Sequence, residues 1–366
     1  MPRAAQLLWT TSLISLISLL ACAPVDEPGG EASEGSEGES DAGQISLEHG
    51  MALYAEYCAF CHGEAGEGYA ADNANALANQ EFLRLASDEF LATSVRYGRP
   101  GTAMSAWGEE RAGPLTAGDI DDLVAFIRSW QEVEDAMVDE LELDPSASVI
   151  RGETYYQVYG CEGCHGELGR GGEYMSLENP WFLTQVSDGY LRESITRGRP
   201  DTAMASFDDQ LTALQIDDLA ALIRSWEREV DSEPLPAFEP DVSDAALNPG
   251  GPDPDFAVSE GRYVGVDAVA DALALGATMI LLDARPHADF VDGHIEGAVS
   301  VPFFQLEQVI DALPQDLWIV SYCGCPHAIS GQAFDSLAAA GFTKIAVLDE
   351  GYYEWVERGY PIAEGE

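Results

Sequence analysis

The chain has 366 residues, 46% of them hydrophobic, and a formal net charge of −48 at pH 7. This length allows two or three domains, each with its own core. So negative a field excludes nucleic acid as a partner, because every phosphate would be repelled. It favours either a basic redox partner, attracted over long range, or adaptation to high salt, and both interpretations stay open.

The N-terminal residues predict export. Arg3 precedes an apolar run that is short for a membrane-spanning helix, so residues 1–21 are typical of a signal peptide. The run ends in Leu-Leu-Ala-Cys, which resembles the lipobox of bacterial lipoproteins and implies lipidation of Cys22. An uncleaved signal anchor is the alternative. Residues 22–45 are rich in Glu, Gly and Ser, which predicts a disordered acidic tether. We therefore expect the protein on the periplasmic or cell-surface side of a bacterial membrane, held there by its lipid.

Two Cys-x-x-Cys-His motifs predict two covalently bound haem c groups. The thiols add to the two vinyl groups of one porphyrin, and the histidine that follows is placed to coordinate the iron. The alternatives are a disulfide within each Cys-x-x-Cys pair, or one zinc ion shared by both pairs. The two sets are Cys58, Cys61 and His62, and Cys161, Cys164 and His165.

Longer phrases repeat around these motifs in the same order. Residues 95–104 match residues 195–204, and residues 121–130 match residues 217–226. This duplication predicts two helical modules over 46–131 and 148–230, joined by an acidic linker over 132–147. Apolar spacing predicts their first helices over Leu47–Tyr57 and Val149–Tyr159. Thr116 and Thr212 are the expected N-caps of their last helices.

The order of these parts resembles class I cytochromes c, an all-α family in which a loop supplies an axial methionine. The resemblance implies Met104 and Met204 as the sixth iron ligands, after the repeated Gly-Arg-Pro turn. His49 has no histidine counterpart in the second module, which argues against two histidine ligands. With both axial positions filled by protein, each haem carries electrons and does not bind substrate. The four other methionines that follow the leader are expected in the core: Met51, Met137, Met175 and Met279.

After a proline-rich linker over 231–258, the pattern over 259–366 changes to alternating strand and helix, as in α/β folds. Strands are expected over Thr278–Asp283, Asp316–Tyr322 and Ile345–Leu348, and a helix over Gln332–Ala340. The whole chain is therefore expected to be multidomain, with two all-α modules followed by a parallel sheet with flanking helices.

This last segment resembles a single rhodanese domain. The phrases that carry the resemblance are Asp283-Ala284-Arg285, Gly293 to Ala298, Val301-Pro302, Tyr322-Cys323 and Leu348 to Gly351. The resemblance implies a persulfide-carrying cysteine in the loop after a strand, where loop amides and a helix dipole stabilise an anionic sulfur.

Cys323 stands at that place, and Cys325 is the alternative nucleophile or a partner that resolves the persulfide. His327 is the only expected cation of the loop, which lacks Lys and Arg, so thiosulfate is a doubtful substrate. Arg285 and His294 belong to fold-defining phrases and are expected to be structural.

Three functions remain open at this point. The chain could oxidise sulfane sulfur at Cys323 and pass the electrons through two haems to a periplasmic redox protein. It could be a tethered two-haem carrier whose last domain is catalytically silent and binds a partner. It could also transfer sulfur independently of the haems.

Overall fold

The computed structural model describes residues 45–71, 74–138, 141–172, 174–230, 233–324 and 327–365. The expected signal peptide, Cys22, the tether up to residue 44 and Cys325 lie outside these ranges. Among the described residues, no helix is long and apolar enough to cross a membrane.

The first module is helical, as its apolar spacing predicts. Its helices are α1 (Leu47–Tyr57), α2 (Ala59–His62), α3 (Gln80–Leu83), α4 (Asp88–Tyr97) and α5 (Ala117–Arg128), with a 3-10 turn η1 at Glu109–Arg111. The bounds predicted for α1 are confirmed. Thr116 begins α5 as predicted, and a reciprocal pair of hydrogen bonds joins its side chain and backbone to those of Asp119.

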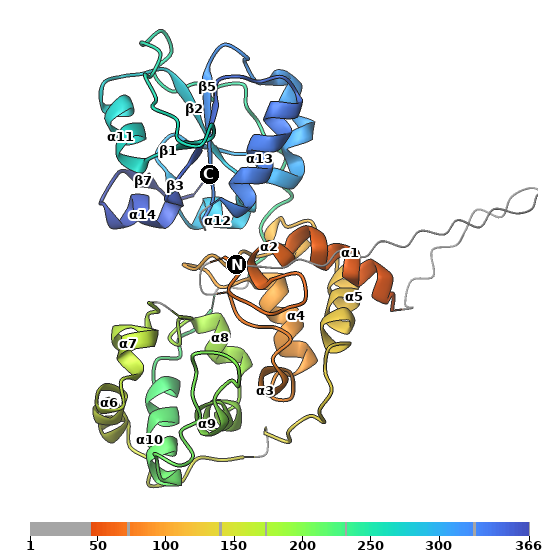
Figure 1. Ribbon diagram of the computed structural model, residues 1–366, viewed down its shortest axis with the longest axis vertical. Coiled ribbons are helices and arrows are strands. Elements are labelled where there is room, and N and C mark those ends of the chain that lie inside the picture. The colour runs from red at the N-terminus through yellow and green to blue at the C-terminus, as the bar shows by residue number, and fades with distance from the viewer. Residues whose placement is uncertain are drawn as a thin grey trace, which may run out of the picture. The chain divides into compact units, whose positions relative to one another are not determined.

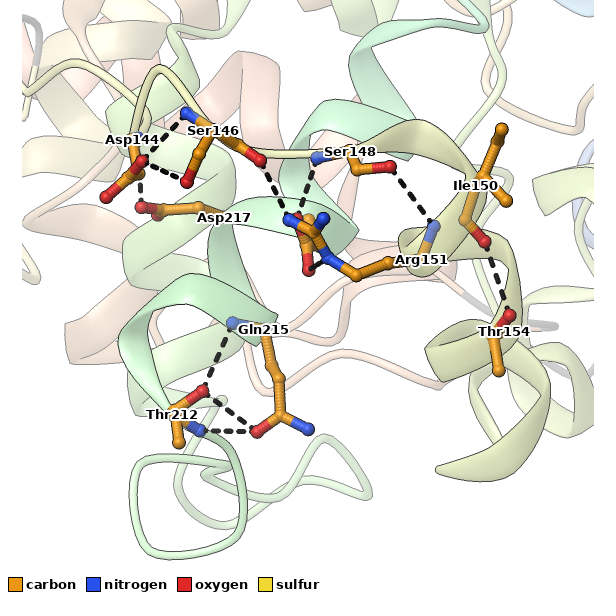
Figure 2. Close-up of polar contacts among 10 residues, drawn as sticks. Asp144, Ser146, Ser148, Ile150, Arg151, Thr154, Thr212, Gln215 and Asp217 are labelled. Carbon is orange, nitrogen blue, oxygen red and sulfur yellow. Dashed lines mark hydrogen bonds and ion pairs between the residues drawn. The ribbon is translucent and has the colours of Figure 1, made fainter.

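The second module repeats these elements. They are α6 (Val149–Val158), α7 (Cys161–His165), η2 (Glu167–Gly169), α8 (Pro180–Gln185), α9 (Asp188–Arg197) and α10 (Ala213–Arg224). The helix predicted to end at Tyr159 ends one residue earlier, with Tyr159 as its C-cap. Figure 2 shows the capping contacts of this module: Ser148 at the start of α6, and Thr212 with Gln215 at the start of α10.

In both modules the first and last helices cross at a glycine. A Cβ atom on Gly50 of α1 would lie 2.1 Å from the carbonyl oxygen of Asp122 in α5. A Cβ atom on Gly152 of α6 would lie 2.2 Å from the carbonyl oxygen of Asp218 in α10. Only glycine permits so close an approach of two backbones. The crossing brings the helix that leads into each Cys-x-x-Cys-His motif against the last helix of its module.

The repeated Ile-Arg-Ser-Trp at the end of α5 and α10 contains an arginine that makes the same contacts in both modules. The guanidinium of Arg128 donates to the carbonyl oxygen of Leu83 at 2.6 Å, and that of Arg224 donates to the carbonyl oxygen of Leu183 at 2.5 Å. Each arginine also reaches an aspartate in the first turn of the preceding long helix, at 2.6 Å and 2.8 Å. These arginines tie the last helix of each module to the helix that precedes its methionine loop.

The C-terminal domain is built on a five-stranded parallel sheet of order β1-β6-β5-β2-β4. The strands are β1 (Tyr263–Val264), β2 (Met279–Asp283), β4 (Val299–Ser300), β5 (Trp318–Tyr322) and β6 (Ile345–Leu348). A small antiparallel pair joins β3 (His294–Ile295) to β7 (Ile362–Ala363). The strand predicted over Ile345–Leu348 is confirmed, and the two others begin one and two residues later than predicted.

Helices cover both faces of this sheet (Figure 1). They are α11 (Val266–Ala274), α12 (His287–Asp292), α13 (Ala328–Ala339) and α14 (Gly351–Glu357), with 3-10 turns η3 (Phe303–Gln308) and η4 (Ile310–Ala312). Met279 and Leu281 pack into one buried cluster, and Ile280 and Leu282 pack into another. This alternation along β2 shows a sheet buried on both faces, as expected of α/β folds. The helix predicted to start at Gln332 starts at Ala328, directly after the Cys323 loop.

Candidate functional sites

The first module encloses a mainly apolar cavity at its Cys-x-x-Cys-His motif. Cys58, Cys61 and His62 line it, and Met104 lines it from the loop after α4. The second module has the matching cavity, lined by Cys161, Cys164, His165 and Met204. The structure therefore brings together each set of four residues that the sequence singled out. Their role as thioether and iron ligands stays a prediction.

A backbone carbonyl orients each histidine. Nδ1 of His62 lies 2.8 Å from the carbonyl oxygen of Asn75, and Nδ1 of His165 lies 3.0 Å from that of Met175. A carbonyl oxygen only accepts, so Nδ1 carries the proton and the Nε2 lone pair is left for a metal. Burial lowers the pKa of both histidines, which favours this neutral form.

A tight loop positions each methionine. The backbone N–H of Arg99 donates to the carbonyl oxygen of Met104 at 2.7 Å, and that of Arg199 donates to Met204 at 2.7 Å. The loop starts at Gly98, which has a φ of +61° and whose Cβ would lie 2.4 Å from the carbonyl carbon of Ser105. The repeated Gly-Arg-Pro therefore shapes the methionine loop, as predicted.

Two arginines of these loops carry positive charge into the cavities, and they provide a test of whether a haem fits. Nε of Arg99 is buried and has no hydrogen-bond partner among the described residues. Desolvation lowers the pKa of Arg99, because its charge is buried, and among the described residues no carboxylate forms an ion pair with it. Arg199 also lines its cavity, where it donates to Ser194 Oγ at 2.9 Å. Haem propionates would supply the missing anionic partners, so the apolar cavity, the ligand set and the cations fit a haem c.

The arrangement does not support a zinc ion shared by the two Cys-x-x-Cys pairs. The pairs line different cavities, and the described residues contain no group of three or more His, Cys, Asp or Glu side chains placed to hold a metal ion.

The prediction that the other methionines lie in the core is only partly right. Met279 is fully buried in β2, as predicted. Met51 and Met137 are 51% and 74% exposed, so for them the prediction is wrong. Met175 lines both haem cavities, a position that sequence reasoning missed. Its place shortly after the second motif, where its carbonyl oxygen meets His165, was the available signal.

In the C-terminal domain, Cys323 directly follows β5 and is fully buried. Its Sγ lies 3.2 Å from Oγ of Ser330 in the first turn of α13. The structure therefore places this cysteine at the strand end and against the start of a long helix, as predicted. Sequence reasoning did not single out Ser330, which lies in the first turn of α13.

His327 lies at the start of α13 in the left-handed region, with a φ of 72°. Its Nε2 is 2.7 Å from Oδ1 of Asp349, which follows β6, and its ring lies 4.1 Å from the ring of Tyr263. Asp349 belongs to a phrase that resembles rhodaneses, but its pairing with His327 depends on the sheet order. His327 is thus fixed at the rim of the Cys323 loop.

Arg285 and His294 are structural, as expected. Arg285 donates to the buried carboxylate of Asp283 at 2.5 Å and to the carbonyl oxygen of Gly293 at 2.7 Å. Nδ1 of His294 lies 2.8 Å from the carbonyl oxygen of Phe290, and its ring stacks on that residue.

The Cys323 loop also contacts the first module. A Cβ on Gly324 would lie 3.7 Å from Cα of Ala103, the neighbour of Met104. Ile329 of α13 lines the first haem cavity. Nearby, Phe303 packs against Tyr57 and Trp107, with ring centres 6.1 Å and 6.3 Å apart. The candidate sulfur site and the first candidate haem site are therefore neighbours.

Comparison with known proteins supports both halves of this description. Residues 46–127 and 147–223 match the family "Cytochrome C oxidase, cbb3-type, subunit III", and residues 266–358 match the family "Rhodanese-like domain". The chain therefore carries two cytochrome c domains of this type and a C-terminal rhodanese-like domain, as the motifs predicted. Cytochrome c domains hold covalently bound haem c, and this chain joins two domains of that type to a rhodanese-like module.

Its relatives each match part of the chain. A cbb3-type cytochrome c oxidase subunit CcoP of Helicobacter pylori is 25% identical over 49% of this chain and 58% of its own length. An HTH-type transcriptional regulator of Mycobacterium tuberculosis is 31% identical over 30% of this chain and 52% of its own length. A sulfurtransferase of Allochromatium vinosum is 28% identical over 27% of this chain and 92% of its own length. The chain thus spans only 52% and 58% of the regulator and the oxidase subunit.

Among solved structures, a Kuenenia stuttgartiensis reducing HAO-like protein complex aligns with 50% of this chain and 98% of the matched chain, at a TM-score of 0.33 and 21% identity. The rhodanese-like domain of an Anabaena protein aligns with 29% of this chain and 80% of its own, at a TM-score of 0.27 and 26% identity.

Proposed function

We propose that the protein is an exported, lipid-anchored two-haem electron carrier that oxidises sulfane sulfur at Cys323. Cys58 and Cys61 would hold the first haem with His62 and Met104 as axial ligands, and the equivalent residues would hold the second. The observation that carries the proposal is the contact of the Cys323 loop with the first haem cavity, through Gly324 and Ile329. The acidic chain would pass the electrons to a basic redox partner outside the cytoplasm.

The chemistry divides into sulfur transfer and oxidation. In the first step the Cys323 thiolate attacks the sulfane sulfur of a donor persulfide, forming Cys323–S–S⁻ and releasing the donor thiol. In the second step this persulfide and one water give Cys323–S–SO⁻, two protons and two electrons. When bound, each haem would accept one electron, so the two haems held by these residues would match one such oxidation.

The chain's own residues would support these steps. The start of α13 offers backbone N–H groups and a helix dipole to an anionic sulfur. Ser330 Oγ, 3.2 Å from Sγ, would donate a hydrogen bond to it. His327, held by Asp349, would take up a proton at the rim. Because Cys323 is fully buried, a donor reaches it only if the residues around it rearrange.

An anaerobic spectrum tests the proposal. A low-molecular-weight persulfide should reduce the haems of the wild-type protein, and Cys323→Ala should slow this at least about tenfold. Dithionite should reduce both proteins equally, which controls for damage to the haem sites. Cys325→Ala, run in parallel, separates the two candidate nucleophiles. Equal reduction of wild type and Cys323→Ala by the persulfide would contradict the proposal.

A second candidate is a carrier whose rhodanese-like domain only binds a partner. The full burial of Cys323 favours it, as does the lack of Lys and Arg in a loop of this kind. Under this function neither wild type nor Cys323→Ala forms thiocyanate from cyanide and a sulfur donor, and both exchange electrons with a redox partner at the same rate.

A further inference from the structure

The two haem cavities share a wall. Five residues line both of them: Asn75, Phe82, Phe90, Arg99 and Met175. Four come from the first module and Met175 comes from the second. Since the same side chains face both cavities, a charge among them acts on both sites at short range. Arg99 is the cation in this shared set.

The wall lies where the two modules pack in matching fashion. Nδ2 of Asn79 donates to the carbonyl oxygen of Pro200 at 2.7 Å, and Nδ2 of Asn179 donates to that of Pro100 at 3.2 Å. These are equivalent residues of the repeat, so the contact is reciprocal, as at a two-fold interface. Phe90 packs at the centre, between residues of both modules.

One difference in sequence breaks this symmetry. The second module has Tyr190 where the first has Phe90, and Arg199 has its Nη2 3.4 Å from the Tyr190 hydroxyl. Arg199 lies over the ring of Tyr190, a residue of its own module. Phe90 offers no hydroxyl, and the guanidinium of Arg99 lies 5.7 Å from the ring centres of both Phe90 and Phe182. Arg99 therefore bridges the two modules, and within the described residues Arg199 lines the second cavity whereas Arg99 lines both.

We propose that Arg99 is a shared cation of the two haem sites, which favours the reduced state of both. The inference rests on the proposed two-haem function and adds to it a positioning and tuning residue. Each reduction adds one negative charge to a site of low polarity, where a fixed positive charge stabilises it. Because one guanidinium faces both sites, its removal acts on both haems, whereas removal of Arg199 acts mainly on the second.

A redox titration of the full-length haem-loaded protein, followed by haem absorbance, tests this. In Arg99→Gln the ratio of reduced to oxidised haem at a fixed potential should fall by about tenfold at both haems. The matched variant Arg199→Gln should lower this ratio mainly at the second haem. Arg99→Lys keeps the charge and should retain most of the wild-type behaviour at both.

The mass of the intact protein separates the two claims. One haem per chain in the wild type would refute the two-haem function itself. If the chain binds two haems and Arg99→Gln lowers the ratio of reduced to oxidised haem at only one of them or at neither, the shared-cation inference alone is overturned. If the Arg99→Gln protein does not bind haem, the Arg99→Lys variant provides the test. A large fall in the ratio of reduced to oxidised haem at both haems, despite the retained charge, also overturns the inference.

Discussion

The two cytochrome modules share one plan, yet equivalent positions make different contacts. Tyr97 of the first module stacks on Trp181 of the second, with ring centres 4.3 Å apart. The residues equivalent to these are Arg197 and Glu81, which form an ion pair at 3.9 Å. The same symmetric contact is thus aromatic on one side and charged on the other. The two modules thus share the plan of their candidate haem sites, while each has contacts of its own.

The two modules should respond most alike, and most strongly, to substitution of the glycine at which their first and last helices cross. Gly50→Ala and Gly152→Ala each force a Cβ against a backbone oxygen, at 2.1 Å and 2.2 Å. We expect each to lower the free energy of unfolding by about 2–3 kcal/mol. Chemical denaturation of the haem-loaded protein measures this.

Gly118→Ala is the matched control, since its Cβ would meet no atom closer than 3.9 Å. It should be neutral or slightly stabilising, because alanine favours the helix. An equal loss of stability in all three variants would show that the crossing is not what requires glycine.

The first helices of the two modules make different contacts with the last helices, and a pair of variants tests this difference. Arg151 donates to both carboxylate oxygens of Asp218 at 2.7 Å (the other contacts of Arg151 are drawn in Figure 2). The equivalent residue of the first module, His49, instead lies 2.8 Å from Asp119 at the surface. Arg151→Ala leaves a buried carboxylate without its cation, so it should lower the thermal midpoint more than His49→Ala does at neutral pH. Equal shifts, or a larger one for His49→Ala, would contradict this.

The smallest expected difference concerns the hydrogen-bonded pairs at the starts of α5 and α10, Thr116 with Asp119 and Thr212 with Gln215. Burial acts to raise the pKa of Asp119, but hydrogen bonds from His49 and Thr116 outweigh it, and the pKa lies below its usual range. A lowered carboxyl pKa contributes stability at neutral pH that is lost as the pH falls through the folded-state pKa, below about pH 4. Gln215 holds the equivalent position in the second module and does not titrate.

Asp119→Asn should therefore destabilise the protein near neutral pH, and its effect should shrink as the pH falls through the folded-state pKa of Asp119. Thermal unfolding of this variant and of Gln215→Ala across the pH range checks it. An effect of Asp119→Asn that is constant with pH would rule out the charge as its source.

Local patterns predicted much of this fold. The spacing of apolar residues located α1 within its bounds, and Thr116 and Thr212 marked helix starts because capping is a local interaction. The Cys-x-x-Cys-His motifs and the matched methionines predicted the residues that meet in each cavity. The start of α13 was missed because His327, which caps the helix, has a left-handed backbone that the residue pattern does not reveal.

The remaining features depend on packing between distant segments. The wall formed by Phe82, Phe90 and Arg99 follows from how two modules meet, and no spacing within one module shows it. The pair of His327 and Asp349 likewise depends on which strands are neighbours in the sheet. The contact of Ile329 with the first haem cavity joins segments more than two hundred residues apart.

We propose that electrons from sulfur enter through the first haem and not the second, because the Cys323 loop and Ile329 contact the first module. Two double variants test it: Cys58→Ala with Cys61→Ala removes the first attachment site, and Cys161→Ala with Cys164→Ala removes the second. Each retains one haem that dithionite should reduce. We expect that a persulfide under anaerobic conditions rapidly reduces the haem left in the second variant and not the one left in the first. Equal rates, or faster reduction when the first haem is missing, would contradict it.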